Sequence, residues 1–435
     1  SFDIVAHETT HAILDGMYGD FTDPTNSDVL AFHEAFSDLV ALLQSFDLTE
    51  LLEHEIRASR GDLQAETLLG KLAVQFGQAV RGREALRSAI GTVVDGTWVR
   101  VMPDPTLLHG RTTPHARGAV LVSAVFDALI GIYEGRTADL FRIASGGTGL
   151  IRDGAIDPDL SRRLASAAAK SARHLLRMCI RALDYIPPVD ITFFDFLRAL
   201  VTADYEFVRD DQYNYRLAVI EAFTKRGIGP GPSDASDAGG RKPESLSDDA
   251  LRWRTFQRAS DAGAKYHYRR IVATLREYAE ACTYASDRQQ LFDITEEHRV
   301  VVKERFMAAC EASGPFRRRL GLDEGDFQVD GLRRAMRARP NGRVDPEVIV
   351  SLIQERPAGD GGGRRLGGVT LVIKVNDDRQ LPRYLIVKGM ADPDRVDEMD
   401  RFAADNAADP LRSLYLAPSD RADRFAALHL PIEEG

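Results

Sequence analysis

Two histidines separated by three residues stand near the start of the chain, in the stretch DIVAHETTHAILDG. Residues i and i+4 share one face of an α-helix, so His7 and His11 can present imidazole nitrogens to one metal ion. Glu8 follows His7, where its carboxylate can take a proton from a water molecule at that metal. Chance can produce this HExxH spacing on any helix that contains histidine. A catalytic zinc site therefore requires a third protein ligand.

The candidate third ligand lies in the stretch AFHEAFSD, within a segment whose apolar residues recur at the helical period. A short connection can fold this second helix back against the first, which brings Glu34 to the two histidines. Asp38 shares a face with Glu34 and can accept the second ring N–H of a ligand histidine. His33, Glu34 and Asp38 would be costly to bury in an apolar helix without partners. The alternative is that Glu34 and Asp38 belong to an ordinary solvated stripe along the helix.

The two stretches together resemble the gluzincin zinc metallopeptidases, and in particular the thermolysin-like enzymes. In that family HExxH is followed by a downstream Glu-xxx-Asp, which here reads HEAFSD. The resemblance covers about residues 1–228 and is strongest around the HExxH motif. It implies zinc as cofactor, Glu8 as general base and Asp38 as the partner of His7. The zinc ligands that it implies are His7, His11 and Glu34.

The stretch TTPHARGAVLVSAVFDAL resembles the family segment in which a histidine precedes a long helix. That resemblance implies that His115 stabilises the oxyanion of the reaction. His109 is a nearby competitor for this role, and a capping or purely structural role for His115 remains open. Arg117 is a candidate to bind a substrate carbonyl or carboxylate, with a surface arginine as the alternative. His33 stands where the family usually has Asn, and its role is open.

The chain also departs from the family. The family places a β-rich lobe before the HExxH helix, and its edge strand binds the substrate backbone. The given sequence contains nothing of that lobe. The family's transition-state tyrosine has no clear equivalent, since Tyr18 is close in sequence but out of register. Asp3 stands where a calcium ligand could lie, without identifiable partner ligands.

Periodicity predicts a mainly α fold. Gly227 is expected at the end of the last helix of the catalytic lobe. Two β-rich runs in residues 367–390 surround Asn376–Arg379 as a hairpin, and residues 327–354 are expected to add strands around a turn at Pro340–Gly342. Helices are expected at 27–46, 117–134, 157–186, 193–206, 213–226 and 392–406.

The expected organisation has four parts. A thermolysin-like helical catalytic lobe (1–228) is followed by a linker (229–248), whose composition is rich in Gly, Pro and Ser. A charged helical segment (249–320) and a small α+β domain of unknown role (321–435) complete the chain.

The composition limits the kinds of partner that the chain is expected to bind. The formal net charge of −10 gives no electrostatic basis for binding nucleic acid or an anionic membrane. We interpret the cluster Arg317–Arg319 as a solvated helix face. The three cysteines are far apart in the sequence and form no disulfide framework. The chain has no run of about 18 apolar residues, so no membrane span is expected. No signal peptide is visible, and we expect a cytoplasmic protein.

We expect a zinc metallopeptidase that acts on a peptide or protein substrate. The alternative is a catalytically weak or inactive zinc-containing scaffold that acts through its C-terminal region. In either case residues 249–435 could bind a protein partner. A third possibility, that the C-terminal region is the functional module and the peptidase part regulates it, has no chemical constellation in 321–435 to support it.

Overall fold

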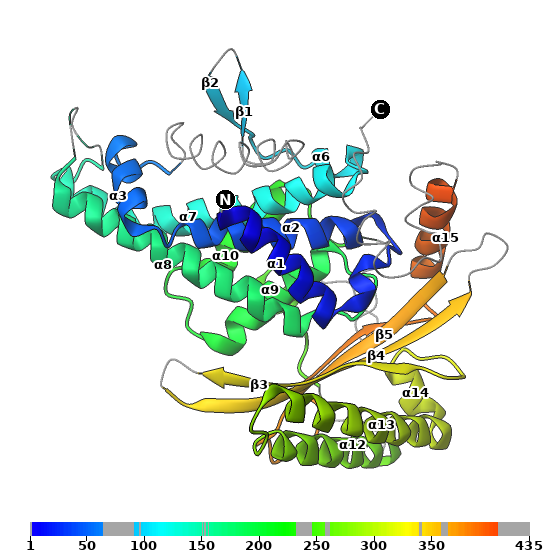
Figure 1. Cartoon of the computed structure of the whole chain (residues 1–435). Helices are drawn as coiled ribbons and strands as arrows, with labels where there is room; N and C mark the ends of the chain where they lie inside the picture. Colours follow the sequence, from blue (N-terminus) through cyan, green and yellow to red (C-terminus); the bar gives the residue numbers. More distant parts are fainter. Residues whose placement is uncertain are drawn as a thin grey trace.

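The computed structural model describes residues 2–63, 91–94, 97–149, 151, 154, 156–231, 246–256, 262–338, 342–357 and 364–407. The expectation of a mainly helical chain with a small C-terminal sheet is confirmed (Figure 1). We call the helices up to residue 225 the helical lobe. They are α1 (Phe2–Met17), η1 (Gly19–Thr22), α2 (Ser27–Ser45), α3 (Thr49–Ala58), α6 (Leu107–Gly110), α7 (Pro114–Ala144), α8 (Pro158–Ala182), η2 (Leu183–Tyr185), α9 (Phe193–Phe207) and α10 (Tyr215–Lys225). A hairpin of β1 (Gly91–Val94) and β2 (Thr97–Arg100) precedes α6.

Local signals explain where several of these helices begin and end. The side chain of Asn26 caps α2 by accepting a 2.7 Å hydrogen bond from the backbone N–H of Asp28. Thr192 and Asp195 form a reciprocal capping box at the start of α9. Gly227 follows α10 with φ of 75°, and a Cβ there would lie 2.2 Å from the carbonyl oxygen of Pro105. Both the backbone angle and this close approach require glycine.

Helix α7 is longer than the predicted range 117–134. Thr113 caps it, Pro114 fits its first turn, and the helix runs through Gly135 to Ala144. By length and composition α7 could cross a membrane, but 72% of its most apolar window is buried among the other helices. The bent pair of α2 and α3 passes the same test if it is taken as one span. The stretch 117–134 is apolar on nearly every side, which predicts a buried core helix, and the burial of α7 agrees with that prediction.

The second half of the chain forms what we call the C-terminal module. Its helices are α12 (Ala262–Ala281), α13 (Arg288–Ala312), α14 (Gly314–Arg319) and α15 (Pro393–Ala407), and its strands are β3 (Gln328–Ala338), β4 (Val344–Pro357), β5 (Arg364–Lys374) and β6 (Tyr384–Lys388). The strands form one antiparallel sheet in the order β3-β4-β5-β6. The predicted hairpin is confirmed, because β5 and β6 pair on either side of Asn376–Arg379. Of the predicted turn Pro340–Gly342, Pro340 and Asn341 lie outside the described residues.

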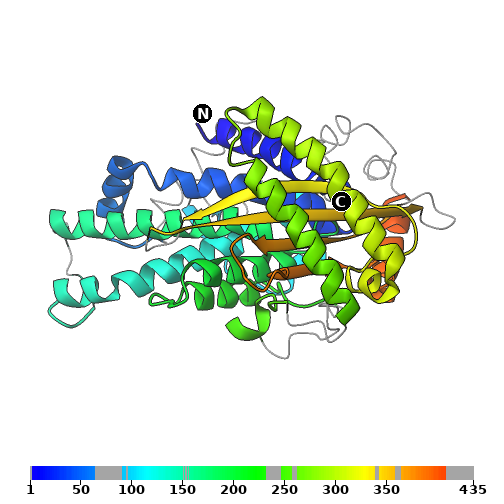
Figure 2. The same ribbon diagram turned by 90° about the horizontal axis from the view of Figure 1, so that it is seen from below.

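The sheet is buried on both faces, between the helical lobe and the pair α12–α13 (Figures 1 and 2). Alternate residues of β4, such as Val348 and Val350, pack with Val272 of α12 and Phe306 of α13. From the opposite face Val372, Tyr384 and Ile386 join the core of the helical lobe. Burial on both faces explains why the strands read as almost continuous apolar runs, VIVSLI and VTLVI.

Ion pairs reinforce the contact between the sheet and the lobe. The acid in each pair belongs to the helical lobe and the base to the C-terminal module: Asp23 with Arg364, Asp184 with Arg333 and Arg337, Asp190 with Arg395, Asp195 with Lys388, and Glu206 with Lys374 and Arg383. Burial opposes ionisation of Glu206, but the charges of Lys374 and Arg383 outweigh it and lower the pKa of Glu206 to about 2. Glu206 therefore stays ionised at the interface.

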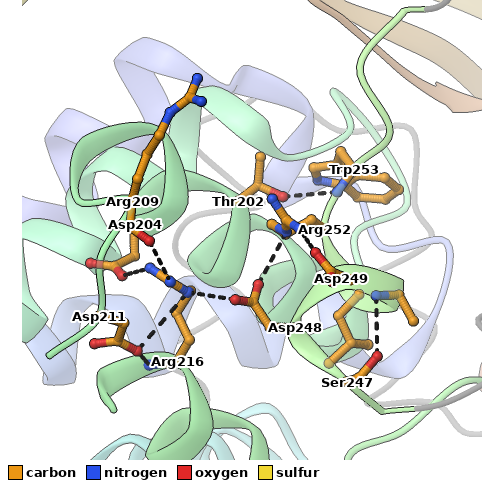
Figure 3. A network of polar contacts seen from close by, with 12 residues as sticks. Thr202, Asp204, Arg209, Asp211, Arg216, Ser247, Asp248, Asp249, Arg252 and Trp253 are labelled. Carbon is orange, nitrogen blue, oxygen red and sulfur yellow. Dashed lines mark hydrogen bonds and ion pairs between the residues drawn. The ribbon is translucent and has the colours of Figure 1, made fainter. Parts of the chain in front are cut away.

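Residues 246–253, which precede α12, also contact the helical lobe. Arg216 of α10 bridges Asp204 of α9, at 2.7 Å, and Asp248 of the short helix α11 (Asp248–Leu251), at 2.8 Å (Figure 3). The backbone N–H of Trp253 donates to the hydroxyl of Thr202 at 2.9 Å. These contacts fix residues 246–253 to the lobe.

Candidate metal centre

Helices α1 and α2 bring the two motifs together. On α1, His7 and His11 lie on the face that packs against α2, while Val5 and Ile13 are exposed on the outer face. Residues 28–37 of α2 are all buried, and Glu34 is 2% exposed. His11 is fully buried. The i, i+4 spacing on α1 and the packing of α2 against it thus bring the three side chains to one buried position.

The three side chains converge on one another. The Nε2 atoms of His7 and His11 are 2.7 Å apart. The carboxylate of Glu34 lies 3.7 Å from Nε2 of His7 and 3.6 Å from Nε2 of His11. Ligand atoms around a tetrahedral zinc ion stand about 3.3 Å apart when the bonds are about 2.0–2.1 Å long, and the three separations bracket this value. Within the described ranges this is the one group of three such side chains close enough to hold a metal ion.

The second nitrogen of each histidine also lies beside a defined group. Nδ1 of His7 is 2.7 Å from a carboxylate oxygen of Asp38. Nδ1 of His11 is 2.6 Å from Nδ1 of His33, and the two rings stack with centroids 4.8 Å apart. Partners on Nδ1 leave both Nε2 atoms facing Glu34, which is the orientation that a metal site needs. Two imidazoles and a carboxylate, buried and oriented in this way, fit a zinc ion.

His33 is the residue whose role the sequence left open. It is fully buried against His11 and occupies the position next to Glu34 on α2. The sequence does indicate that His33 has a polar contact, since a histidine inside an apolar helix needs a polar partner. What the sequence could not show is whether it would meet His7 or His11.

His115 and Arg117 both lie in the first turns of α7, with different surroundings. Nε2 of His115 is 3.4 Å from the carboxylate of Glu34, and its side chain is 31% exposed. His109 is exposed on α6. Arg117 pairs with Asp28 and donates to the carbonyl of Leu108 at 2.8 Å. These contacts tie the segment before α7 to α2, and we assign Arg117 to that structural task.

The sequence also raised Tyr18 and Asp3 as candidates. Tyr18 is buried, and its hydroxyl contacts the carbonyl of Leu183 and the guanidinium of Arg333. It does not face the metal group. The side chain of Asp3 lies outside the described residues.

Gly118 sets how closely α7 approaches α2. A Cβ at Gly118 would stand 2.8 Å from the carbonyl oxygen of Ala31 and 3.4 Å from the backbone nitrogen of Ala35. Both neighbours are backbone atoms of α2, so they cannot move aside without shifting that helix. Gly118 lies one turn beyond His115, which makes the short His115–Glu34 distance depend on this packing.

We predict that Gly118→Ala lowers the free energy of unfolding by about 1–3 kcal/mol, the usual cost of overpacking. It should also weaken zinc binding, because α2 carries Glu34. Gly135→Ala on the same helix is the control: a Cβ there meets nothing within 4 Å. Replacing an exposed helical glycine by alanine should raise the free energy by about 0.5–1 kcal/mol. Denaturant unfolding measures the change in the free energy of unfolding for both variants. Equal changes in Gly118→Ala and Gly135→Ala would contradict the packing argument.

The chain was compared with known proteins. No protein-family model, curated protein or solved structure matches it. The residues of the site are therefore the basis for assigning a function.

Proposed function

We propose that this chain is a zinc-dependent metallopeptidase of the thermolysin-like, gluzincin type. The observation that carries the proposal is the buried convergence of His7, His11 and Glu34, with Glu8 following the first ligand on α1. Two histidines and one glutamate are a ligand set that catalytic zinc sites use, with one position left for water or substrate.

A bound zinc ion would supply Lewis acidity, lowering the pKa of a water molecule and polarising a carbonyl group. Glu8 takes one proton from the attacking water, whose oxygen adds to the carbonyl carbon of the peptide bond. Glu8 then gives this proton to the amide nitrogen as the C–N bond breaks. These steps give one carboxylic acid and one amine. The acid then passes its proton to the amine, which leaves a carboxylate and an ammonium group, so atoms and charges balance.

Other residues of the site prepare this chemistry. His115 is partly exposed and lies beside Glu34, where it can donate a hydrogen bond to the oxyanion that forms on the carbonyl. Asp38 and His33 hold the ligand histidines in their orientation.

The purified protein should contain about one zinc ion per chain and cleave members of a mixed peptide library. A chelator should abolish cleavage, and added zinc should restore it. Elemental analysis measures the zinc content, and mass spectrometry of the library measures the cleavage. A filled zinc site with no cleavage would contradict the peptidase proposal and favour the zinc-containing scaffold instead.

A further inference from the structure

Residues 18–26, which we call the connecting segment, join the two helices that carry the metal group. Helix α1 ends at Met17 and α2 begins at Ser27, so this segment fixes where one helix stands relative to the other. His11 lies about two turns before the segment, and Glu34 lies about two turns after it. A helix is stiff over that distance, so a displacement of the segment would carry over to the ligands.

The C-terminal module contacts the connecting segment at its first residue. The guanidinium of Arg333 on β3 lies over the ring of Tyr18, 5.0 Å from the ring centroid, and donates to its hydroxyl. Arg333 also binds Asp184 at 2.8 Å. Burial raises the pKa of Tyr18 to about 12, although the charge of Arg333 opposes it. Tyr18 therefore stays neutral and keeps its hydrogen bond to the carbonyl of Leu183.

The module contacts the segment again in its middle and at its end. Arg364 of β5 pairs with Asp23, which is 8% exposed. At the end, Asp190 accepts hydrogen bonds of 2.7 Å from the side chains of Thr25 and Asn26. The other oxygen of Asp190 accepts from Arg395 of α15 at 2.8 Å.

Arg395 ties this last contact to the rest of the module. It is 1% exposed and also donates to the carbonyl oxygens of Gly389 and Leu366. Burial of Asp190 opposes its ionisation, but the charges of Arg395 and Lys388 lower its pKa. Asn26, which Asp190 holds, is also the residue that caps α2. The start of a ligand helix is therefore linked to the sheet and to α15.

We propose that the C-terminal module positions the metal group, with Arg333, Arg364 and Arg395 as positioning residues that hold the connecting segment. A metal site requires ligands held within about 0.5 Å of their bonding geometry. The acids that these arginines meet are buried, and a buried carboxylate without its partner is strongly unfavourable. The connecting segment can thus keep its place only while the module is docked. This inference rests on the proposed zinc centre.

The experiment compares Arg333→Gln and Arg364→Gln with the matched control Arg365→Gln. Arg365 is the neighbour of Arg364 on β5 but pairs with Asp400 of α15, inside the module. A second control, Lys374→Gln, removes a pair with Glu206 that joins the two layers away from the connecting segment. Zinc affinity is measured by competition with a chromogenic chelator. Amide hydrogen exchange of residues 18–30 is measured on zinc-free protein.

We expect zinc affinity to fall about 3- to 10-fold in Arg333→Gln and Arg364→Gln, less than the 10- to 100-fold typical of direct partners of ligand histidines. Amides of residues 18–30 should exchange faster in both variants, and both controls should match the parent protein. The side chain of Arg364 is 36% exposed, so its variant should fold even if Arg333→Gln does not.

Unchanged zinc affinity in Arg364→Gln would overturn the inference, as would an equal loss in Lys374→Gln. Faster exchange without weaker zinc binding would also overturn it, because the segment would then move without affecting the ligands. If the parent protein takes up no zinc, the proposed function fails. The exchange data on zinc-free protein would still decide whether the module holds the connecting segment.

Discussion

Glu8→Gln should leave zinc binding intact and lower peptide hydrolysis by about 10²- to 10⁴-fold, the range that a general base contributes. Glutamine has nearly the same shape as glutamate but cannot take a proton from water. Zinc affinity should be preserved because Glu8 is outside the group of His7, His11 and Glu34. Elemental analysis gives the zinc content, and kcat on a peptide chosen from the library gives the loss of activity.

Asp15→Asn is the matched control for this variant. Asp15 lies on the same helix, two turns beyond Glu8, and its substitution removes the same charge from the same element. Its activity should stay close to that of the parent protein. Full activity in Glu8→Gln would rule out Glu8 as the base. Loss of zinc in Glu8→Gln would instead assign the residue to metal binding.

The parts of the fold that the sequence predicts well are those decided by neighbours in the chain. The apolar period predicts α2 almost to its ends. The sequence offers Ser27 or Asn26 as its N-cap, and the structure has Asn26 there. Apolar residues on nearly every side of the stretch 117–134 predict the burial of α7. The helix expected at 157–186 is close to the extent of α8 and η2 together, which end at Tyr185 shortly before Pro187. The hairpin of β5 and β6 follows from turn residues between two β-rich runs. In each case the signal lies within a few residues of its effect.

The arrangement of the layers depends on residues far apart in the chain. Arg364 meets Asp23, and Arg395 meets Asp190, although the sequence gives no sign that these pairs exist. An arginine in a strand or in a helix is compatible with a solvated face and with a buried ion pair alike. Whether such an arginine is solvated or buried in an ion pair depends on how the sheet docks on the helical lobe. That docking depends in turn on the three-dimensional packing of both faces of the sheet.

The candidate metal centre depends both on signals between neighbours in the chain and on contacts between distant residues. The spacing of His7 and His11 and the pair of Glu34 and Asp38 predict one group, and the structure brings their side chains together. The stacking of His33 on His11 was not predictable, since it depends on the rotation of α2 about its axis. The proximity of His115 depends on how closely α7 approaches α2, which Gly118 permits.

Glu34→Gln should abolish zinc binding, with affinity lower by about 100-fold or more. It removes the carboxylate that lies between His7, His11 and His115, and a neutral amide is a poor ligand for zinc. The zinc-free variant should unfold at the same denaturant concentration as the zinc-free parent protein or at a higher one, because burying a charged carboxylate is costly. The effect should therefore appear only when zinc is added.

Denaturant unfolding with and without zinc separates these effects. A ligand present at about 1,000 times its Kd stabilises the folded state by about 4 kcal/mol, so the parent protein should gain this amount and Glu34→Gln almost none. Glu55→Gln is the control, since Glu55 is a similarly buried glutamate on α3, 3% exposed and separate from the metal group. It should keep the full gain. A zinc-dependent gain in Glu34→Gln equal to that of the parent would remove Glu34 from the ligand set. The two histidines would then lack the third ligand that distinguishes a zinc site from a chance spacing on a helix.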